Sequence, residues 1–368
     1  MVINRLRSSI AIFALVVTVV FVVTVERKYS ETLFIPVTVE RTAENRREIA
    51  IVVIVANNKK DEEYVLARST FRCYAQARDY VMLEVNLKEN YTDVCSGSDF
   101  FFRRHCVLTE IMDEYSGIEW FLFLDADVGV VNPNHLIEEY TDQEADLIFY
   151  NRLWNYEITS GSYLARNSVF ARKFLRHWSS YEHKVKMGTK HGTDNGALHE
   201  VFLDFFCSTC APRRRSECIE LWHKSHTLSD LLHYESCARE ILGPAEWFRS
   251  GNGTVRQLSL GRGYWSRDAL PTDSKWSDDD FMIHGWKEIR RNEQWKNVFA
   301  VESLDPVNCN STSTMHLSFA YNSEFRTEVN VTRNLILKAA FDSYKEHVDR
   351  LKDIARVQLR EINNKSLL

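Results

Sequence analysis

The sequence W-F-L-F-L-D-A-D-V-G-V-V-N-P, from Trp120 to Pro133, sets two carboxylates inside an otherwise apolar run. Residues 121–124 are large and apolar without alternation, which predicts a strand covered on both faces in a mainly parallel sheet. The strand must end near Asp125, because an ionised carboxylate is not left unpaired in a core. Asp125 and Asp127, two apart on extended backbone, can point to one side and share one divalent cation. An exposed acidic turn is the alternative.

The composition of the 368-residue chain is that of an ordinary globular protein, with 45% apolar and 26% charged residues. This length allows one large domain or two small ones, with a sizeable core. The formal charge of −5 leaves no basic excess for contacts to phosphate groups. We therefore expect no nucleic-acid partner.

Strands and helices alternate around the opening stretch. Residues 49–56 form a β-branched run that predicts a buried strand, residues 62–78 have helical spacing, and residues 80–87 alternate like a second strand. Residues 146–150 predict another strand. This order predicts an α/β fold with a mixed, mainly parallel, Rossmann-like sheet flanked by helices. The predicted domain spans residues 49–305.

A C-terminal extension, residues 306–368, follows the predicted domain. It contains a predicted helix at about 332–362. The apolar face of this helix is expected to include Leu335, Ala339, Val348, Leu351, Ile354 and Ala355.

An apolar segment near the N-terminus predicts a membrane anchor. Residues 10–25 carry no charge, and Arg5 and Arg7 precede them. The segment is short for a membrane core about 30 Å thick, but the flanking serines bring it to about the lower limit of 17 residues. A cleaved signal peptide is the alternative, although no small-residue cleavage site follows. The arginines favour a cytoplasmic tail at 1–9, a stem at 26–48 and a lumenal body.

Two further features agree with a lumenal body. Five glycosylation acceptors of the N-x-S/T type follow the apolar segment, at Asn90, Asn252, Asn310, Asn330 and Asn364. Eight cysteines also follow it, and an even number in an oxidising compartment predicts disulfides. For the group from Cys207 to Cys237, which contains three histidines, a zinc site is the alternative.

Three groups of residues leave their interpretation open. The tryptophans at 154, 265, 276 and 286 can stack on sugar faces, although half or more are expected in the core. The acids at 278–280 can form a second ligand set or a solvated turn. Lys59 or Lys60, after the first predicted strand, can meet a nucleotide or lie in solvent.

Four motifs occur in order between Asp125 and Lys287, namely D-A-D, G-S-Y-L-A-R-N, T-D-N-G-A-L and I-H-G-W-K. The set resembles the retaining GT-A glycosyltransferases of the α-galactosyl, α-mannosyl and α-xylosyl type, and most closely a nematode-expanded branch related to them. The resemblance covers roughly residues 49–295. It implies a GT-A fold and transfer of a hexose or pentose from a UDP-sugar to a glycan, glycoprotein or glycolipid acceptor, with retention of the anomeric configuration.

The resemblance implies a metal and diphosphate site. Asp125 and Asp127 would coordinate Mn²⁺ (or Mg²⁺) together with the diphosphate of the UDP-sugar. His284 would complete the metal site, and Lys287 would contact the diphosphate. The family spaces these two residues as H-x-x-G-x-K, whereas this chain has the shorter H-G-W-K. A metal ion and a lysine also suit the negative charge that a leaving nucleoside diphosphate develops.

The other two motifs imply a donor-sugar site. Gly161 and Ser162 correspond to a stretch that lines the donor sugar. Asp194 matches an acid that binds sugar hydroxyls. Asn195 matches an amide under the anomeric carbon, where the family usually has glutamine. From its position before an apolar helical pattern, Asp194 or Thr193 is also suited to cap that helix.

The expected protein is a type II membrane glycosyltransferase of the Golgi or ER, with its catalytic body in the lumen. Two other classes remain open. A nucleotidyltransferase also needs a metal-binding D-x-D motif, but the predicted anchor and glycosylation acceptors disfavour it. A non-catalytic lumenal sugar-binding or scaffold protein would keep the fold and tolerate the departures at Asn195 and at H-G-W-K.

Overall fold

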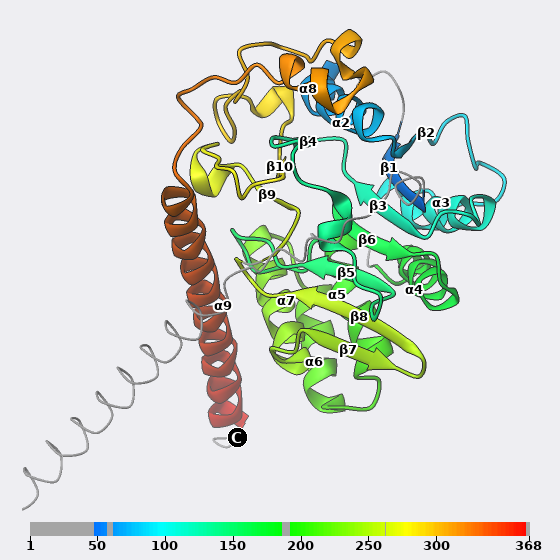
Figure 1. Cartoon of the computed structure of the whole chain (residues 1–368). Helices are drawn as coiled ribbons and strands as arrows, with labels where there is room; N and C mark the ends of the chain where they lie inside the picture. Colours follow the sequence, from blue (N-terminus) through cyan, green and yellow to red (C-terminus); the bar gives the residue numbers. More distant parts are fainter. Residues whose placement is uncertain (1–47, 57–61, 186–191, 262, 366–368) are drawn as a thin grey trace, which may run out of the picture. The chain divides into compact units, whose positions relative to one another are not determined.

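A computed structural model describes residues 48–56, 62–185, 192–261 and 263–365, with the side chains of the last helix described to residue 357 (Figure 1). The chain divides into two compact units, Met1–Glu40 and Arg41–Leu368, and every described residue belongs to the second. Among the described residues, no helix combines the length and apolar character needed to cross a membrane. The predicted tail (1–9) and anchor (10–25), and all but the last residue of the predicted stem (26–48), lie outside the described residues.

A seven-stranded sheet forms the centre of the second unit, in the order β2-β1-β3-β6-β5-β8-β7. Its strands are β1 (Ile49–Val55), β2 (Val81–Asn86), β3 (Trp120–Leu124), β5 (Leu147–Tyr150), β6 (Ser162–Arg166), β7 (Trp247–Ser250) and β8 (Gly253–Leu258). Five of these seven strands run in one direction, while β6 and β7 run in the other. The prediction of a mixed, mainly parallel sheet is therefore confirmed.

Both faces of this sheet are buried. In β1 the odd-numbered residues from Ile49 to Val55 enter one apolar core, and the even-numbered residues enter another on the opposite face. Strand β3 divides in the same way, with Trp120 on one side and Phe121 on the other. Two covered faces explain why the sequences of these strands are apolar without alternation.

Helices cover the sheet unevenly. On one face lie α2 (Val65–Arg78) and a small second sheet, and on the other lie helices that include α3, α4, α5 and α7. The bounds are α3 (Phe100–Glu114), α4 (Val169–Ser179), α5 (Thr193–Phe206), α6 (Pro212–His223) and α7 (Leu228–Leu242), with α6 packed on α7 (Figure 1). The predicted flanking of the sheet by helices is confirmed, whereas the small second sheet was not predicted.

The small sheet positions a late segment of the chain beside the D-x-D motif. Its strands are β4 (Val128–Val130), β9 (Ser266–Asp268) and β10 (Met282–His284), in the order β4-β10-β9. Strand β10 is antiparallel to β4 and parallel to β9, so His284 lies opposite Val128 on one side and Asp268 on the other. The register of three short strands therefore carries His284 to the carboxyl end of β3.

The start of α5 corrects the predicted helix cap. Gly192 precedes the helix with φ of +67°, and no side chain caps this end. Asp194 lies inside the first turn, where Arg104 and His105 engage its carboxylate. Gly192 adopts a left-handed φ without strain, and Thr193 follows it with φ of +48°, so the turn into the helix is made by the backbone of these two residues and not by a side-chain cap.

The eight cysteines form four disulfides, which confirms the disulfide prediction. The pairs are Cys73–Cys309, Cys95–Cys106, Cys207–Cys210 and Cys218–Cys237. The alternative zinc site between Cys207 and Cys237 is wrong, because all the cysteines there are paired and none is left as a thiolate ligand. The last pair joins α6 to α7.

The C-terminal part of the chain ends in a long helix. After η7 (Pro306–Asn310) and α8 (Thr312–Ser318) comes α9 (Val329–Lys365), which packs against α7. Its most buried positions differ from the predicted apolar face and are Thr332, Ala340, Ser343, His347 and Ile354. Only Ile354 was predicted among them, and Ala355 is exposed. Specific contacts account for two of them, because Thr332 shares a hydrogen bond with Ser277 and the His347 ring lies 4.8 Å from that of Tyr156.

Candidate metal and donor site

The D-x-D motif lies at the carboxyl end of β3, as predicted. Asp125 follows Leu124 directly, and its N–H donates to the carbonyl of Gly161 at 2.7 Å. The N–H of Val128 donates back to the carbonyl of Asp125 at 3.0 Å, which closes a turn before β4. Asp127 is buried, with 5% of its surface exposed. The motif is therefore a fixed element of the sheet edge, and the alternative of an exposed turn is wrong.

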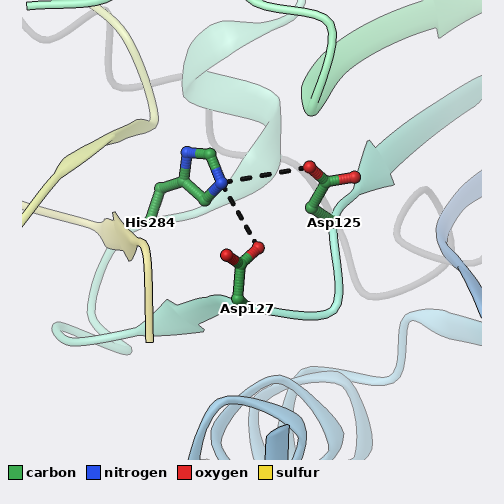
Figure 2. A group of neighbouring side chains, drawn as sticks. All are labelled: Asp125, Asp127 and His284. Carbon is green, nitrogen blue, oxygen red and sulfur yellow. Dashed lines mark ion pairs between the residues drawn. The ribbon is translucent and has the colours of Figure 1, made fainter. Parts of the chain in front are cut away.

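Asp125, Asp127 and His284 point toward one another (Figure 2). Each offers one ligand atom, and these atoms lie within 4.8 Å of one another. His284 Nε2 lies 3.3 Å from Asp127 Oδ1 and 3.9 Å from Asp125 Oδ2. Two carboxylates and an imidazole around one point are a donor set suited to a divalent cation.

The electrostatics of this group favour positive charge at its centre. Burial alone lowers the pKa of His284, but the carboxylates of Asp127 and Asp268 outweigh it and raise this pKa to about 10. Burial raises the pKa of Asp127, yet His284 and Lys287 together bring it well below the ordinary value. Burial raises the pKa of Asp125, and Arg104 only partly offsets this rise. The geometry therefore stabilises a cation between the two acids.

The short H-G-W-K string brings both of its charged residues to Asp127. Gly285 takes φ of +104°, and its N–H and that of Trp286 donate to the carbonyl of Asp127 at 3.1 and 2.9 Å. The Trp286 ring is fully buried beside Gly129, where a Cβ would collide with it. Lys287 Nζ then lies 3.7 Å from Asp127 Oδ2, with its side chain 46% exposed. The shorter spacing thus still places His284 and Lys287 at the motif.

Gly161 and Ser162 lie directly beside the acids. A Cβ on Gly161 would collide with the Asp125 carboxylate and would lie 3.6 Å from His284. Only glycine fits here. The hydroxyl of Ser162 is fully buried and accepts a hydrogen bond from the Trp265 indole at 2.8 Å. The role of this pair in lining a donor sugar stays a prediction.

Asp194 is linked to Asp125 through Arg104, and Asn195 follows it in α5. Asp194 is only 1% exposed, and its Oδ2 accepts from Arg104 Nη2 at 2.6 Å and from His105 Nε2 at 3.0 Å. Burial raises the pKa of Asp194, but Arg104 and His105 bring it below the ordinary value. Asn195 is partly exposed, and its Nδ2 lies 3.4 Å from Glu157 Oε1. The catalytic roles of both residues stay predictions.

Arg104 and His105 of α3 belong to the site and were not predicted. Arg104 is buried and pairs with both Asp194 and Asp125, so one guanidinium links the candidate metal ligand to the candidate sugar ligand. Burial lowers the pKa of His105 to about 4, so its contact with Asp194 is a hydrogen bond from a neutral imidazole. Its Nδ1 then accepts from the Tyr163 hydroxyl at 2.9 Å. Two consecutive basic residues in a helix were the only sequence signal.

A second unpredicted group, Asp268 with Arg152, contacts the Nδ1 side of His284. Asp268 Oδ1 lies 3.5 Å from His284 Nδ1, opposite the face that meets the acids. Arg152 pairs with Asp268 at 2.5 Å and with Glu157 at 2.8 Å. A carboxylate on the second nitrogen of a histidine fixes its ring orientation, as in many metal sites. Each of these residues lies near a predicted motif, but nothing in their local sequence marks them.

The remaining candidates are not ligands of the metal cluster. Trp265, Trp276 and Trp286 are buried, as expected for half or more of that group, and Trp154 is exposed. The solvated-turn alternative for residues 278–280 is wrong for Asp280, which is buried and pairs with Arg267 at 2.6 Å. Lys59 and Lys60 lie outside the described residues.

Comparison with known families assigns the chain to one of them. The family described as protein of unknown function, DUF273, matches residues 71–301. The chain belongs to this family. The DUF273 match contains every residue of the site above, while β1 and α9 lie outside it. No curated protein matches this DUF273 protein.

Two solved structures resemble the DUF273 protein weakly. A glycosyltransferase involved in the glycosylation of the major capsid of PBCV-1 is 15% identical over 66% of this chain and 97% of its own, with a TM-score of 0.40. A197 from STIV is 11% identical over 40% of this chain and 73% of its own, with a TM-score of 0.23. Both TM-scores are too low for these likenesses to bear on function.

Proposed function

We propose that this DUF273 protein is a metal-dependent glycosyltransferase that moves a hexose or pentose from a UDP-sugar to a glycan acceptor. The observation that carries the proposal is the cluster of Asp125, Asp127 and His284 at the carboxyl edge of the sheet, with Lys287 beside it. Open α/β sheets bind their ligands at this edge. A lysine and a cation there suit a diphosphate.

The donor set fits Mn²⁺ or Mg²⁺. Asp125 and Asp127 would hold the ion through carboxylate oxygens and His284 through Nε2, while Asp268 keeps the imidazole oriented. Hard oxygen ligands with one imidazole suit these ions better than the thiolate sets of structural zinc. Once bound, the ion would act as a Lewis acid that stabilises charge on the departing diphosphate.

The residues around the cluster have separate tasks in this proposal. Lys287, half exposed, supplies a mobile positive charge for the diphosphate. Gly161 leaves free the space that any side chain would take from the Asp125 carboxylate. Asp194, buried and held by Arg104 and His105, is the acid proposed to accept hydrogen bonds from sugar hydroxyls. Asn195 presents its amide from the first turn of α5.

We propose that transfer retains the anomeric configuration. An inverting reaction needs a general base that is free to take the acceptor proton. Three described acids beside the cluster are already in ion pairs. Asp194 pairs with Arg104. Both Glu157 and Asp268 pair with Arg152. The departing diphosphate can take the proton instead. Proton NMR of the first product tests this, and a β-linked product from an α-linked donor would contradict it.

We propose a lumenal location, with residues 10–25 as the anchor in a Golgi or ER membrane. Four disulfides support an oxidising compartment. The asparagines of four acceptor sequences are exposed, at Asn90, Asn252, Asn310 and Asn330. Treatment of the expressed protein with an endoglycosidase should lower its apparent molecular mass on a denaturing gel. An unchanged band would contradict this location.

The test of the catalytic proposal is UDP release from a panel of UDP-hexoses and UDP-pentoses by the purified full chain with Mn²⁺. Asp127→Asn keeps the side-chain size but removes the charge that holds the cation, so turnover should fall at least 100-fold, about the effect of losing one strong electrostatic contact. Asp278→Asn is the matched control, because Asp278 is exposed and pairs with Arg326 away from the cluster.

Three outcomes separate the possibilities. Loss in Asp127→Asn, with Asp278→Asn unchanged, supports the enzyme. Equal turnover in both variants would show that the cluster has no catalytic role. No release from any donor by the unaltered chain would leave the non-catalytic sugar-binding protein as the better account.

A further inference from the structure

The loop between β5 and β6 presents one exposed aromatic ring. All nine tryptophans lie in the described part of the chain, and Trp154 is the exposed one, with 37% of its surface accessible. Its loop neighbours Leu153, Asn155 and Glu157 are each less than 5% exposed. A large aromatic side chain that stays exposed between buried neighbours marks a place where a ligand can bind.

The loop holds this ring in place without using the ring itself. The bridge between Asn151 and Ile158 closes the loop, and the N–H of Arg152 donates to the carbonyl of Glu157 at 2.9 Å. From α9, Arg350 donates to the carbonyl of Asn155 at 3.2 Å. Because the loop backbone is already held in place, binding of a ligand to Trp154 costs little conformational entropy of the loop.

Contacts through Arg152 place Trp154 beside the candidate site. The guanidinium carbon of Arg152 lies 5.3 Å from the centre of the Trp154 ring. The same guanidinium pairs with Asp268, which supports His284, and with Glu157, which lies beside the Asn195 amide. Arg152 thus lies between Trp154 and two acids of the site, namely Asp268 beside His284 and Glu157 beside the Asn195 amide.

The charges around Trp154 select the kind of ligand. Arg152 is balanced by two carboxylates, so it offers no spare positive charge to a phosphate or an acid. The positive charge available to a diphosphate is that of Lys287 on Asp127 instead. Arg152 lies over the Trp154 ring and leaves part of the ring surface accessible. An accessible aromatic surface without a free charge suits the C–H face of a neutral pyranose.

We infer that Trp154 is the acceptor subsite, on which a neutral pyranose at the end of a glycan stacks. This inference rests on the proposed glycosyl transfer, because that reaction requires a second sugar beside the donor. The acceptor ring lies on Trp154, and the donor diphosphate lies at the metal cluster. Arg152 lies between the acceptor ring and the donor diphosphate. It contacts Trp154, Asp268 and Glu157 and so holds these three side chains in fixed positions.

The test compares Trp154→Ala and Trp154→Phe with a matched control. Trp247→Ala removes a partly buried tryptophan that also lies under an arginine, Arg256 at 5.1 Å, but on the edge strand β7. Full-length protein with Mn²⁺ is applied to an array of glycans that end in neutral pyranoses, and its affinity for UDP is measured by calorimetry. Neither measurement needs turnover.

Trp154→Ala should weaken binding to the array about tenfold, the order expected for loss of one aromatic platform. Trp154→Phe should keep most of the binding, and Trp247→Ala all of it. UDP affinity should fall far less than glycan affinity in Trp154→Ala.

Each contrary result has its own meaning. Equal array binding by Trp154→Ala and the unaltered chain overturns the inference, and so does an unaltered chain that binds no glycan. A matching loss of UDP affinity would assign Trp154 to the donor and overturn the acceptor role. Array binding that depends on Trp154, in a chain that releases no UDP from any donor, would end the proposed enzyme and leave the sugar subsite standing.

Discussion

Arg104 offsets the negative charge of two acids in the candidate site, because its buried guanidinium pairs with both Asp194 and Asp125. Arg104→Met should lower the free energy of unfolding by about 3–5 kcal/mol, since it leaves buried carboxylates without their partner. Arg103→Met is the matched control. Arg103 is the next residue of the same helix, and no carboxylate partner of it is found among the described residues. Urea denaturation measures both variants, and equal losses would show that Arg104 is not a special partner.

The same pair of arginines shows where sequence reasoning ends at the scale of residues. Asp125 and Asp127 could be predicted to meet from the spacing of the D-x-D motif, and His284 was placed beside them by the family resemblance. Arg103 and Arg104 are chemically identical, and nothing in their spacing tells which one meets the carboxylates of Asp125 and Asp194. Asp268 is likewise defined by its cross-strand position opposite His284, and that register exists only in the folded sheet.

At the scale of elements, the turn after β10 depends on one glycine. Gly285 has φ of +104°, a conformation that costs a residue with a Cβ about 1–3 kcal/mol. Gly285→Ala should therefore lower the melting temperature and weaken Mn²⁺ binding, because the turn fixes both His284 and Lys287. Gly117→Ala is the control, since an added Cβ has open space at both positions and Gly117 lacks the positive φ. Similar melting temperatures for the two variants would contradict this reading of the turn.

Strands with an apolar run were predictable, including the four-residue β5, whereas the three-residue strands were not. Strands β1 and β3 are buried on both faces, so their apolar runs identify them from sequence alone. Strands β4, β9 and β10 have three residues each, too few to show a period. Helix α9 was predicted close to its bounds, but its buried face includes Thr332, Ser343 and His347, which a search for apolar spacing cannot find.

At the scale of the molecule, buried histidines set the response to acid. Burial lowers the pKa of His105 to about 4, of His199 to about 3 and of His347 to about 4, against about 6.5 in an unfolded chain. The unfolded chain therefore takes up protons first as the pH falls below about 6.5. These three histidines therefore lower the free energy of unfolding from there toward pH 4, whereas Glu235, whose pKa burial raises, acts in the opposite direction. His284, whose pKa is raised, adds a slope of the opposite sign around pH 6.5, because its unfolded form is still taking up a proton that the folded form already holds.

Urea denaturation at pH 7, 6 and 5 measures this response. His347→Gln should flatten it, because the replacement cannot be protonated and lies in α9 away from the candidate site. The same pH dependence in His347→Gln and in the unaltered chain would contradict the assignment for His347.

The four disulfides differ greatly in the length of chain they close. Cys73–Cys309 has a sequence separation of 236 and Cys95–Cys106 one of 11. In the chain-entropy description, the longer loop gains roughly 3 kcal/mol more stability. The double variant Cys73→Ser/Cys309→Ser should thus unfold at lower urea than Cys95→Ser/Cys106→Ser. Equal midpoints would show that the native contacts of α2 and η7, and not ring closure, dominate.

The Cys73–Cys309 bond also encloses almost the whole DUF273 match, residues 71–301. A protease that nicks the chain once between Asp127 and His284 would separate the candidate metal ligands onto two polypeptides. Those polypeptides would stay covalently attached, so the nicked protein would run as one band until a reductant is added. A two-chain form could then keep an assembled metal cluster. A non-reducing gel would therefore not distinguish this two-chain form from the intact chain.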